Sequence, residues 1–539
     1  MKNILKNMSL LAVGAMLSTS CIEETFPESS LVTADQLSLS ADALESSLNG
    51  IPSQMCQWYY VYGSQVHETD MGYIMFPILD TELLGDIYPE GEDSGYDWFR
   101  SYNVSTGMGV NSYPAYLSWF SLYRHVKAAN DILAAVDLDK ATDVVKTFAG
   151  EALTCRALYY YQLMVHWEAF ENIYTDCSKV AGLTVPIITE KTTGEEATKT
   201  ERATHAEMVA FILNDLKQAE TLMLTKPSSL SLPSLACVYG MMARVYMWDE
   251  DYANAAVYAR KAIDTHGGAP VTKAQWLDLN TGFNTSNQAW MWRVSYDPEN
   301  MANLCNWTGW MSSEADWGYS SLTKPAIDRR LYDHINYTDF RKQSYLDPDR
   351  TKFEYETCRD QKWLDDQPDY LSLKFRCVNG DWETYTIGGA CEVPIMRVEE
   401  FYLIEAEAVG ASKSVAEGVN LLTSFMTQYR DPAYVTKAND LDALQKEVLT
   451  QMRIEFWGEG TAFASAKRLR VGVMQNYDGT NAPADIFKLN CKGIKPNWNF
   501  MIPQKEIDAH PNLEGKNNPD PSKVIITPCA VNEYAPANF

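Results

Sequence analysis

The sequence predicts a mainly α-helical protein in which helical hairpins form a scaffold and an irregular, loop-rich region binds ligand. Three observations support this class. Apolar residues recur at spacings of three and four over long stretches before residue 270 and after residue 394. One of these stretches carries the small residues of a helical repeat. Between residues 271 and 393 the pattern is irregular, with frequent Gly, Pro, Asn and Trp, and the helices predicted there are few and short.

The first 20 residues read as a signal peptide. Lys2 and Lys6 precede an apolar stretch at residues 8–17, which is too short to span a bilayer, since spanning takes about 20 residues. Small residues and then Cys21 follow, an order that resembles a bacterial lipoprotein box in which the Cys is lipidated. Ser18 stands where the usual box has a branched apolar residue. The alternative is an ordinary signal peptide with an incidental Cys.

Periodicity predicts the helices of the scaffold in chain order. Leu153, Ala157, Tyr160, Met164 and Trp167 share one helix face, for example. The predicted helices cover residues 116–136, 153–167, 206–223, 233–248, 252–266, 395–409, 416–429 and 441–456. Residues 189–202 are polar and aperiodic, which predicts a surface loop.

The hairpin at residues 234–267 resembles a tetratricopeptide repeat. Small residues at its fixed positions let two helices approach closely. The matching positions are Tyr239, Met242, Ala243, Tyr246, Ala255 and Ala262. Ala259 and Gly267 replace the phenylalanine and the proline of the pattern, and no other pair keeps a 34-residue register. The sequence therefore predicts a few repeat-like hairpins inside a larger fold and no regular solenoid.

Composition excludes several functions. A formal charge of −26 argues against nucleic acid, whose phosphates need Lys and Arg. None of the eleven cysteines has C-x-x-C or zinc-ligand spacing, Cys155 and Cys237 are expected to be buried thiols, and the sequence leaves disulfide pairing open. Common catalytic motifs and a D-x-D-x-D-G run are missing, so we expect no enzyme and no cofactor; a calcium ion stays open as an alternative that the sequence does not indicate. Glycoside hydrolysis, which needs only two carboxylates, stays open as an alternative.

Four motifs occur in order along the chain, at residues 150–161, 394–408, 453–469 and 502–513. Together they resemble the SusD/RagB family of nutrient-binding outer-membrane lipoproteins. Within them Arg156, Glu405, Arg453 and Glu455 lie among apolar neighbours, where a charge needs a partner, so we expect them to be structural ion pairs.

The resemblance implies a single SusD-like domain over residues 21–539. Its helical scaffold would cover residues 30–270 and 394–470, with a loop-rich insertion at 271–393. It also implies a lipid-anchored outer-membrane protein, facing the exterior, that binds glycans and partners a SusC-like TonB-dependent transporter. Glu23 and Glu24 follow Cys21 and resemble the surface-export signal of lipoproteins in Bacteroides-type bacteria.

Two aromatic-rich stretches predict where a glycan binds. Sugars pack their C–H faces on aromatic rings and hydrogen-bond to carboxylates and amides. Residues 80–103 and 290–319 supply both kinds of group and lack helical periodicity, which predicts loops. The candidate ligand-binding residues are Asp86, Tyr96, Trp98, Asn103, Trp292, Tyr296, Trp307, Trp310 and Trp317. For each ring the alternative is packing within a long loop, and the aromatic tract at 58–62 is expected to be core.

Two other functions remain open beside glycan capture and delivery. One is a peptide- or protein-binding repeat module at the same location, and the other is a glycoside hydrolase.

Overall fold

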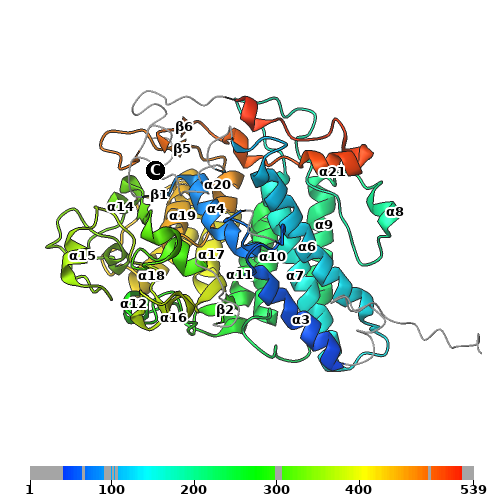
Figure 1. Cartoon of the computed structure of the whole chain (residues 1–539), viewed down its shortest axis with the longest axis horizontal. Coiled ribbons are helices and arrows are strands. Elements are labelled where there is room, and N and C mark those ends of the chain that lie inside the picture. The colour runs from blue at the N-terminus through cyan, green and yellow to red at the C-terminus, as the bar shows by residue number, and fades with distance from the viewer. Residues whose placement is uncertain are drawn as a thin grey trace, which may run out of the picture.

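The computed structural model describes residues 41–63, 67–89, 99, 102, 107–297, 306–483 and 487–524. Helices dominate these residues, and the few strands are short, which confirms the predicted class. In Figure 1 long helices fill the right side and the centre, whereas short elements joined by loops form the left side.

Six helices on the right side of Figure 1 form the first half of the scaffold. Each packs on its neighbours, in the sequence α3, α6, α7, α9, α10, α11, and α11 packs on α17. Side-chain caps at Ser112, Thr142 and Thr204 begin α6, α7 and α9 by accepting from backbone N–H groups of the first turn. The six helices are α3 (Ala41–Met55), α6 (Tyr113–Ala135), α7 (Asp143–Trp167), α9 (His205–Leu222), α10 (Leu235–Trp248) and α11 (Tyr252–His266).

The hairpin of α10 and α11 has the predicted repeat-like packing. Ala243, Ala255, Ala259 and Ala262 are all fully buried, so the two helices meet through methyl groups. The predicted helices at 233–248 and 252–266 are thus confirmed to within two residues.

The second half of the scaffold lies at the centre of the molecule. Its helices are α4 (Met75–Leu84), α17 (Val398–Ser412), α18 (Val415–Tyr429), α19 (Leu441–Glu455) and α20 (Ala462–Arg468). Helices α17 and α18 approach so closely that a β-carbon on Gly418 would lie 2.5 Å from the carbonyl oxygen of Ala406. Glycine is therefore required at that contact.

Three antiparallel strand pairs join distant parts of the chain. They are β1 (Ile87–Pro89) with β3 (Pro325–Ile327), β2 (Trp290–Ser295) with β4 (Glu392–Arg397), and β5 (Val473–Met474) with β6 (Asn490–Cys491).

The β2–β4 pair corrects two predictions. Residues 395–397 belong to a strand, so the predicted helix at 395–409 begins at Val398 instead. Residues 290–295 form a strand and not a loop, and residues 80–84 end helix α4. Trp290, Trp292 and Val294 are almost fully buried, whereas Arg293 and Ser295 are half-buried. A strand of six residues gives only a weak periodic signal in sequence, and its partner β4 is distant along the chain.

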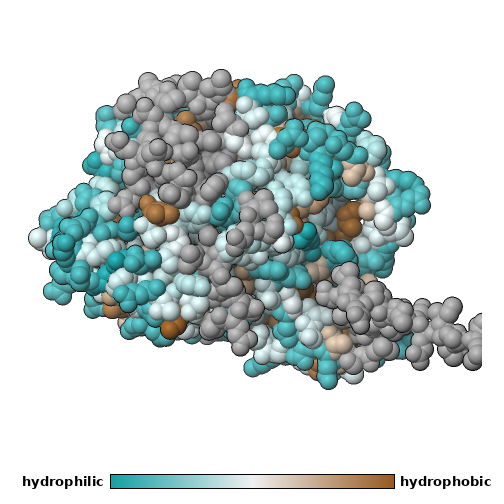
Figure 2. All heavy atoms as spheres, in the orientation of Figure 1, coloured by the Kyte–Doolittle hydropathy of each residue, from teal (hydrophilic) through white to brown (hydrophobic). Residues whose placement is uncertain are grey.

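Short elements complete the described chain. Between residues 271 and 393 they are α12 (Lys273–Leu277), α13 (Trp307–Met311), η3 (Gly318–Ser321), α14 (Arg329–His334), η4 (Phe340–Ser344), α15 (Gln361–Asp365), η5 (Val378–Gly380) and α16 (Tyr385–Gly388). Elsewhere they are η1 (Gly72–Ile74), α8 (Gly194–Ala197), η7 (Pro496–Trp498), α21 (Gln504–Ala509), η8 (Pro511–Leu513) and η9 (Pro521–Lys523). The predicted surface loop at 189–202 contains only the single turn α8. Figure 2 shows that the visible face is mostly hydrophilic, with small separate hydrophobic spots.

The motif charges are paired, as the sequence predicts. Arg156 binds Asp215 and Glu190, Glu405 binds Arg260, and Arg453 binds Asp86.

Glu455 lies at the centre of a buried ionic cluster. Its carboxylate accepts from Arg341 at 3.0 Å, Arg397 at 3.1 Å and Arg430 at 2.7 Å. Burial opposes ionisation of Glu455, but the three guanidinium groups outweigh it and hold the pKa of this carboxyl far below its usual range. The complete cluster balances four cations against four anions: Arg341, Arg397, Arg430 and Lys374 with Asp339, Glu399, Glu455 and Glu459.

Glu151 is a buried carboxyl of the opposite kind. It lies on α7, and neither of its oxygens has a hydrogen-bond partner among the residues that the structure describes. Burial, with repulsion from Glu45, raises its pKa from 4.5 to about 8. Glu151 is therefore protonated in the folded chain at neutral pH.

We expect Glu455→Gln to lower the free energy of unfolding by about 3–5 kcal/mol, because it leaves buried guanidinium groups without their shared counter-charge. Urea unfolding followed by circular dichroism measures the loss. Asp442→Asn is the control on the same helix; its pair with Lys446 is exposed, and we expect a change within about 1 kcal/mol. Equal effects of the two substitutions would contradict the central role of the cluster.

We expect Glu151→Gln to stabilise the protein increasingly as pH rises. The folded-state pKa is above the unfolded value of 4.5, so ionisation costs stability progressively between pH 4.5 and about 8. Glutamine removes this cost, and the gain should reach at least about 1 kcal/mol at pH 8 and vanish near pH 4. Thermal unfolding at both pH values tests this, with the exposed Glu171→Gln as control. A gain that does not depend on pH would refute it.

Candidate functional site

A shallow hollow lies where the two predicted ligand-binding stretches meet. The pairing of Ile87 with Ile327 and of Tyr88 with Ala326 brings strand β1 beside β3. Helix α4, strand β1, helix α13 and the start of β3 line the hollow, together with Phe99 and the two residues before β3. The full lining is Ile78, Glu82, Ile87, Tyr88, Phe99, Trp310, Met311, Thr323, Lys324 and Pro325. Its volume of about 30 Å³ is far too small to enclose a sugar ring, so a ligand could only rest on it.

Aromatic rings form one wall of the hollow. The Trp310 ring stacks on Tyr319 with centroids 4.2 Å apart and planes at 17°. Phe99 meets the other side of Trp310 edge-on at 5.0 Å. Trp310 and Phe99 are buried, whereas Tyr319 is half-buried. Tyr319 is thus the ring of this group that reaches solvent.

Two polar atoms at the hollow have no partner among the described residues. They are the indole nitrogen Nε1 of Trp310 and the hydroxyl Oγ1 of Thr323. A buried donor usually has a partner, in the protein, in water or in a ligand. The hollow therefore offers an apolar ring wall beside groups able to hydrogen-bond to a hydroxyl-rich ligand.

Ion pairs and hydrogen bonds fix the strand that carries Tyr88. Gly85 ends α4 in the left-handed conformation, at φ 72°, and turns the chain into β1. Arg453 Nε then donates to both oxygens of Asp86 at 3.0–3.1 Å, and Trp457 Nε1 donates to the Asp86 carbonyl at 2.8 Å. Burial raises the pKa of the Asp86 carboxyl, and Arg453 opposes the rise.

The Tyr88 hydroxyl donates to Asp328 at 3.2 Å, and the Tyr477 hydroxyl donates to the same carboxylate at 2.9 Å. Burial raises the pKa of Asp328 to about 6, although the Tyr477 hydrogen bond lowers it. Asp328 thus holds β1 and β3 together from behind the hollow.

The predicted site residues lie in different surroundings in the structure. Trp310 lines the hollow. Asp86 is buried and bound to Arg453, which favours a structural role for it. Tyr96, Trp98 and Asn103, and the lipidation residue Cys21, lie outside the described residues.

Four further candidates are buried in the core, which favours the packing alternative for them. Trp292 lies on β2 and donates from Nε1 to the Ser231 carbonyl at 2.9 Å, and Tyr296 follows on the same side of the chain. Trp307 meets Phe375 edge-on at 5.4 Å. Trp317 packs in a small cluster with Cys377 and Trp382.

No sequence pattern singles out Phe99 or Thr323 for the hollow. Tyr88 and Tyr319 lie inside the predicted stretches, but their neighbours have the same composition. Only the pairing of β1 with β3, two three-residue strands, selects these positions.

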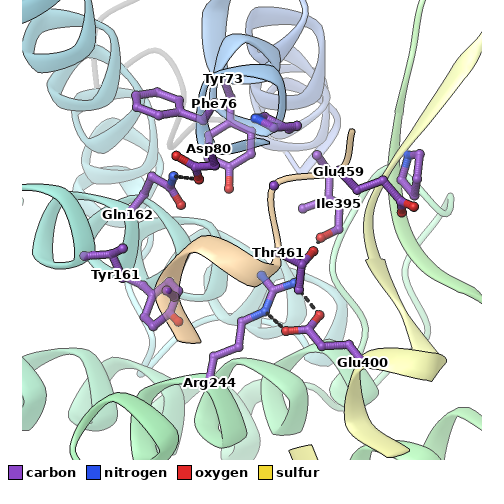
Figure 3. A pocket seen from close by; sticks show the side chains of 15 residues that line it. Tyr73, Phe76, Asp80, Tyr161, Gln162, Arg244, Ile395, Glu400, Glu459 and Thr461 are labelled. Carbon is purple, nitrogen blue, oxygen red and sulfur yellow. Dashed lines mark hydrogen bonds and ion pairs between the residues drawn. The ribbon is translucent and has the colours of Figure 1, made fainter. Parts of the chain in front are cut away.

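A second cavity lies inside the scaffold and is shown in Figure 3. Gln162 Nε2 donates to Asp80 at 3.1 Å on one side, and Arg244 binds Glu400 at 2.6 Å on the other. Figure 3 shows these side chains converging from separate helices around Thr461. A volume of about 50 Å³ suits a few waters and excludes a sugar. This cavity belongs to the polar interior of the scaffold.

The described part of the chain lacks two other features. No group of three or more His, Cys, Asp or Glu side chains there is arranged to hold a metal ion. None of its helices is both long and apolar enough to cross a membrane.

One family model matches part of the chain, and many solved structures have a similar fold. A model of the SusD-like family described as "Starch-binding associating with outer membrane" matches residues 83–247. No curated protein matches the chain.

Several solved structures share the fold at low sequence identity. A SusD-like carbohydrate binding protein from Bacteroides vulgatus aligns with a TM-score of 0.68 at 18% identity, over 89% of this chain and 98% of that one. A SusD superfamily protein from Bacteroides thetaiotaomicron gives 0.66 at 17%, over 90% and 100%. Surface glycan-binding protein A of the latter organism, solved with laminarihexaose, gives 0.61 at 16%, over 89% and 99%. The chain therefore has a SusD-like fold, and residues 83–247 match the SusD-like family model.

Proposed function

We propose that this protein is a surface-exposed, lipid-anchored glycan-binding protein that captures oligosaccharides or polysaccharides and passes them to a TonB-dependent outer-membrane transporter. The observation that carries the proposal is the meeting of two aromatic stretches, more than 200 residues apart in sequence, at the hollow beside Trp310. The fold it shares with a protein solved in complex with laminarihexaose supports the same ligand class.

The chemistry of the hollow suits a carbohydrate better than an apolar ligand. The Tyr319 ring, supported from one side by its stack on Trp310, offers its other face to the C–H face of a sugar, while the Trp310 N–H and the Thr323 hydroxyl can bond to sugar hydroxyls. A shallow site binds a chain along its length, which suits an oligosaccharide. We propose that Trp98, Tyr96 and Asn103 add to this surface, since Phe99 of the same stretch lines it.

The membrane anchor and the partner come from the N-terminal sequence and the family. Lipidation at Cys21 would hold the protein on the outer membrane, and Glu23 and Glu24 would direct it to the exterior. We propose a SusC-like transporter as the protein to which glycan is delivered. We also propose that binding involves no hydrolysis.

One observation favours the alternative of a peptide-binding module. A groove of about 620 Å³ runs between α6, α7 and α9, and Phe211 and Leu222 line it together with the ion pair of Arg156 and Asp215. A helical groove with apolar and charged walls is a common way to hold a peptide. The glycan hypothesis is preferred because this groove has no cluster of stacked rings on its wall.

We expect Tyr319→Ala to weaken glycan binding two- to tenfold, since a lost ring contact is worth about 0.5–1.5 kcal/mol. Affinity electrophoresis against a polysaccharide panel measures the retardation. Tyr258→Ala is a matched control, because Tyr258 is also half-buried and stacks on Tyr246, at 5.4 Å in the α10–α11 hairpin.

If Tyr319→Ala leaves the retardation unchanged and a substitution away from the hollow abolishes it, the glycan site does not lie at the hollow. If no polysaccharide retards the wild-type chain and peptides bind it, the groove is the functional surface. Release of reducing sugar from any polysaccharide in the panel would show that the protein hydrolyses glycans, which would contradict the proposed binding function.

We expect Cys21→Ser to release the protein from membranes, because the sequence offers lipid at Cys21 as its anchor. Detergent phase partition of cell extracts, with radiolabelled fatty acid incorporation, measures this. The substitution Cys177→Ser is the control and should leave the protein in the detergent phase. An unlabelled wild-type chain would disprove lipidation.

A further inference from the structure

Two cysteine thiols meet at the base of a surface loop in the left part of Figure 1, where α15 lies. Cys377 is fully buried, and Cys358 is half-buried. The Cys358 thiol is in hydrogen-bond contact with the thiol of Cys377. After Cys377 the chain turns, with the Gly380 N–H donating to the Cys377 carbonyl at 3.0 Å. A β-carbon on Gly380 would lie only 3.4 Å from the β-carbon of Cys358. The two ends of the loop are therefore in direct contact.

A buried carboxylate holds both ends of the loop in place. One oxygen of Glu314 accepts from the Cys358 backbone N–H at 3.0 Å, and the other accepts from Arg376 at 2.9 Å. Ser312 Oγ lies 3.5 Å from the Cys377 sulfur. The backbone around both cysteines is thus positioned without a covalent link, so a link would demand little movement. Small backbone movement is the main geometric condition for a disulfide.

The loop closed by the two cysteines has little core of its own. It carries α15, and Leu364, Leu371 and Leu373 of the loop pack with Leu346 in a satellite cluster, whereas Phe375 near the end of the loop joins the main core. Small clusters under long loops open more readily than the main core does. A covalent link at the base would restrict such opening.

We propose that Cys358 and Cys377 form an intramolecular disulfide in the exported protein. The inference rests on the proposed export, which brings the chain to an oxidising compartment, and is independent of glycan binding. The oxidant is a disulfide of the thiol–disulfide exchange class. The Cys358 thiolate, the more accessible of the two, attacks one sulfur of the oxidant and releases its first thiol. The Cys377 thiolate then attacks the Cys358 sulfur and releases the second, so two cysteine thiols are oxidised and one disulfide is reduced to two thiols.

The rate of the first step should depend on pH. The hydrogen bond with Cys377, then burial, then the charge of Glu314 raise the pKa of the Cys358 thiol, so the thiolate is scarce at neutral pH. Two arginines next to the cysteines in sequence carry positive charge: Arg376 binds Glu314 at 2.9 Å, and Arg359 lies 3.7 Å from Asp316. Oxidation should accelerate as pH rises.

Peptide mapping tests the link on the mature full-length chain. The protein is incubated with oxidised glutathione, denatured with N-ethylmaleimide to block remaining thiols, and digested without reductant by trypsin and a protease that cuts before aspartate. This digestion separates residues 353–359, which contain Cys358, from residues 377–380, which contain Cys377, and from residues 381–397, which contain Cys391. We expect peptides 353–359 and 377–380 to be joined, with a mass two hydrogens below their sum.

Two variants sharpen the test. Cys358→Ser should leave Cys377 fully alkylated, whereas Cys177→Ser should leave the link intact. Trypsin cleavage of the folded chain after Arg359 and Lys362 should be slower before reduction than after it, and Cys358→Ser should lose that difference. Full alkylation of both cysteines in oxidised wild type, or a link from Cys377 to Cys391, would overturn the proposal. Glycan retardation of the same samples is scored separately, so either hypothesis can fail alone.

Discussion

The fold depends on one buried carboxylate, Glu455, and on the three arginines that neutralise it. Burying an isolated charge is costly, so each member of the cluster requires the others. Its members come from η4, from the end of β4, from the residue after α18 and from α19, and they hold these elements against one another. The cluster is electrically balanced, which allows so many charges to lie in a protein interior.

The hollow is positioned from the same helix. Arg453, one half-turn from Glu455 on α19, binds Asp86 at the entry to β1, and Trp457 holds the backbone of Asp86. Strand β1 is therefore fixed to the ionic core on one side and paired with β3 on the other. The scaffold therefore holds the rings at the hollow rigidly. Rigid support of this kind is what a precise binding site for the proposed glycan would need.

Local patterns predict the long helices because each has an apolar stripe and caps, as α9 and α11 illustrate. The repeat-like hairpin is equally readable, since its buried alanines keep fixed spacings. Strand β2 is not readable in this way, because it has only six residues and its pairing with β4 is non-local. The candidate site is predictable only as two stretches of chain. Which rings approach solvent depends on packing: Trp292, Trp307 and Tyr319 have similar sequence surroundings, yet only Tyr319 is half-exposed.

The ion pair between Arg453 and Asp86 joins residues 367 positions apart. This separation affects the order in which parts of the chain can fold. Helices α6 and α7 adjoin in sequence and can pack as soon as both have been synthesised. Asp86 lacks its ion-pair partner Arg453 until 367 further residues have followed it. Contacts of such long range form slowly, because the entropy of closing the loop is lost before the contact is gained. A chain that cannot complete its core early stays unfolded and open to threading for longer, a property that would suit the proposed export across a membrane.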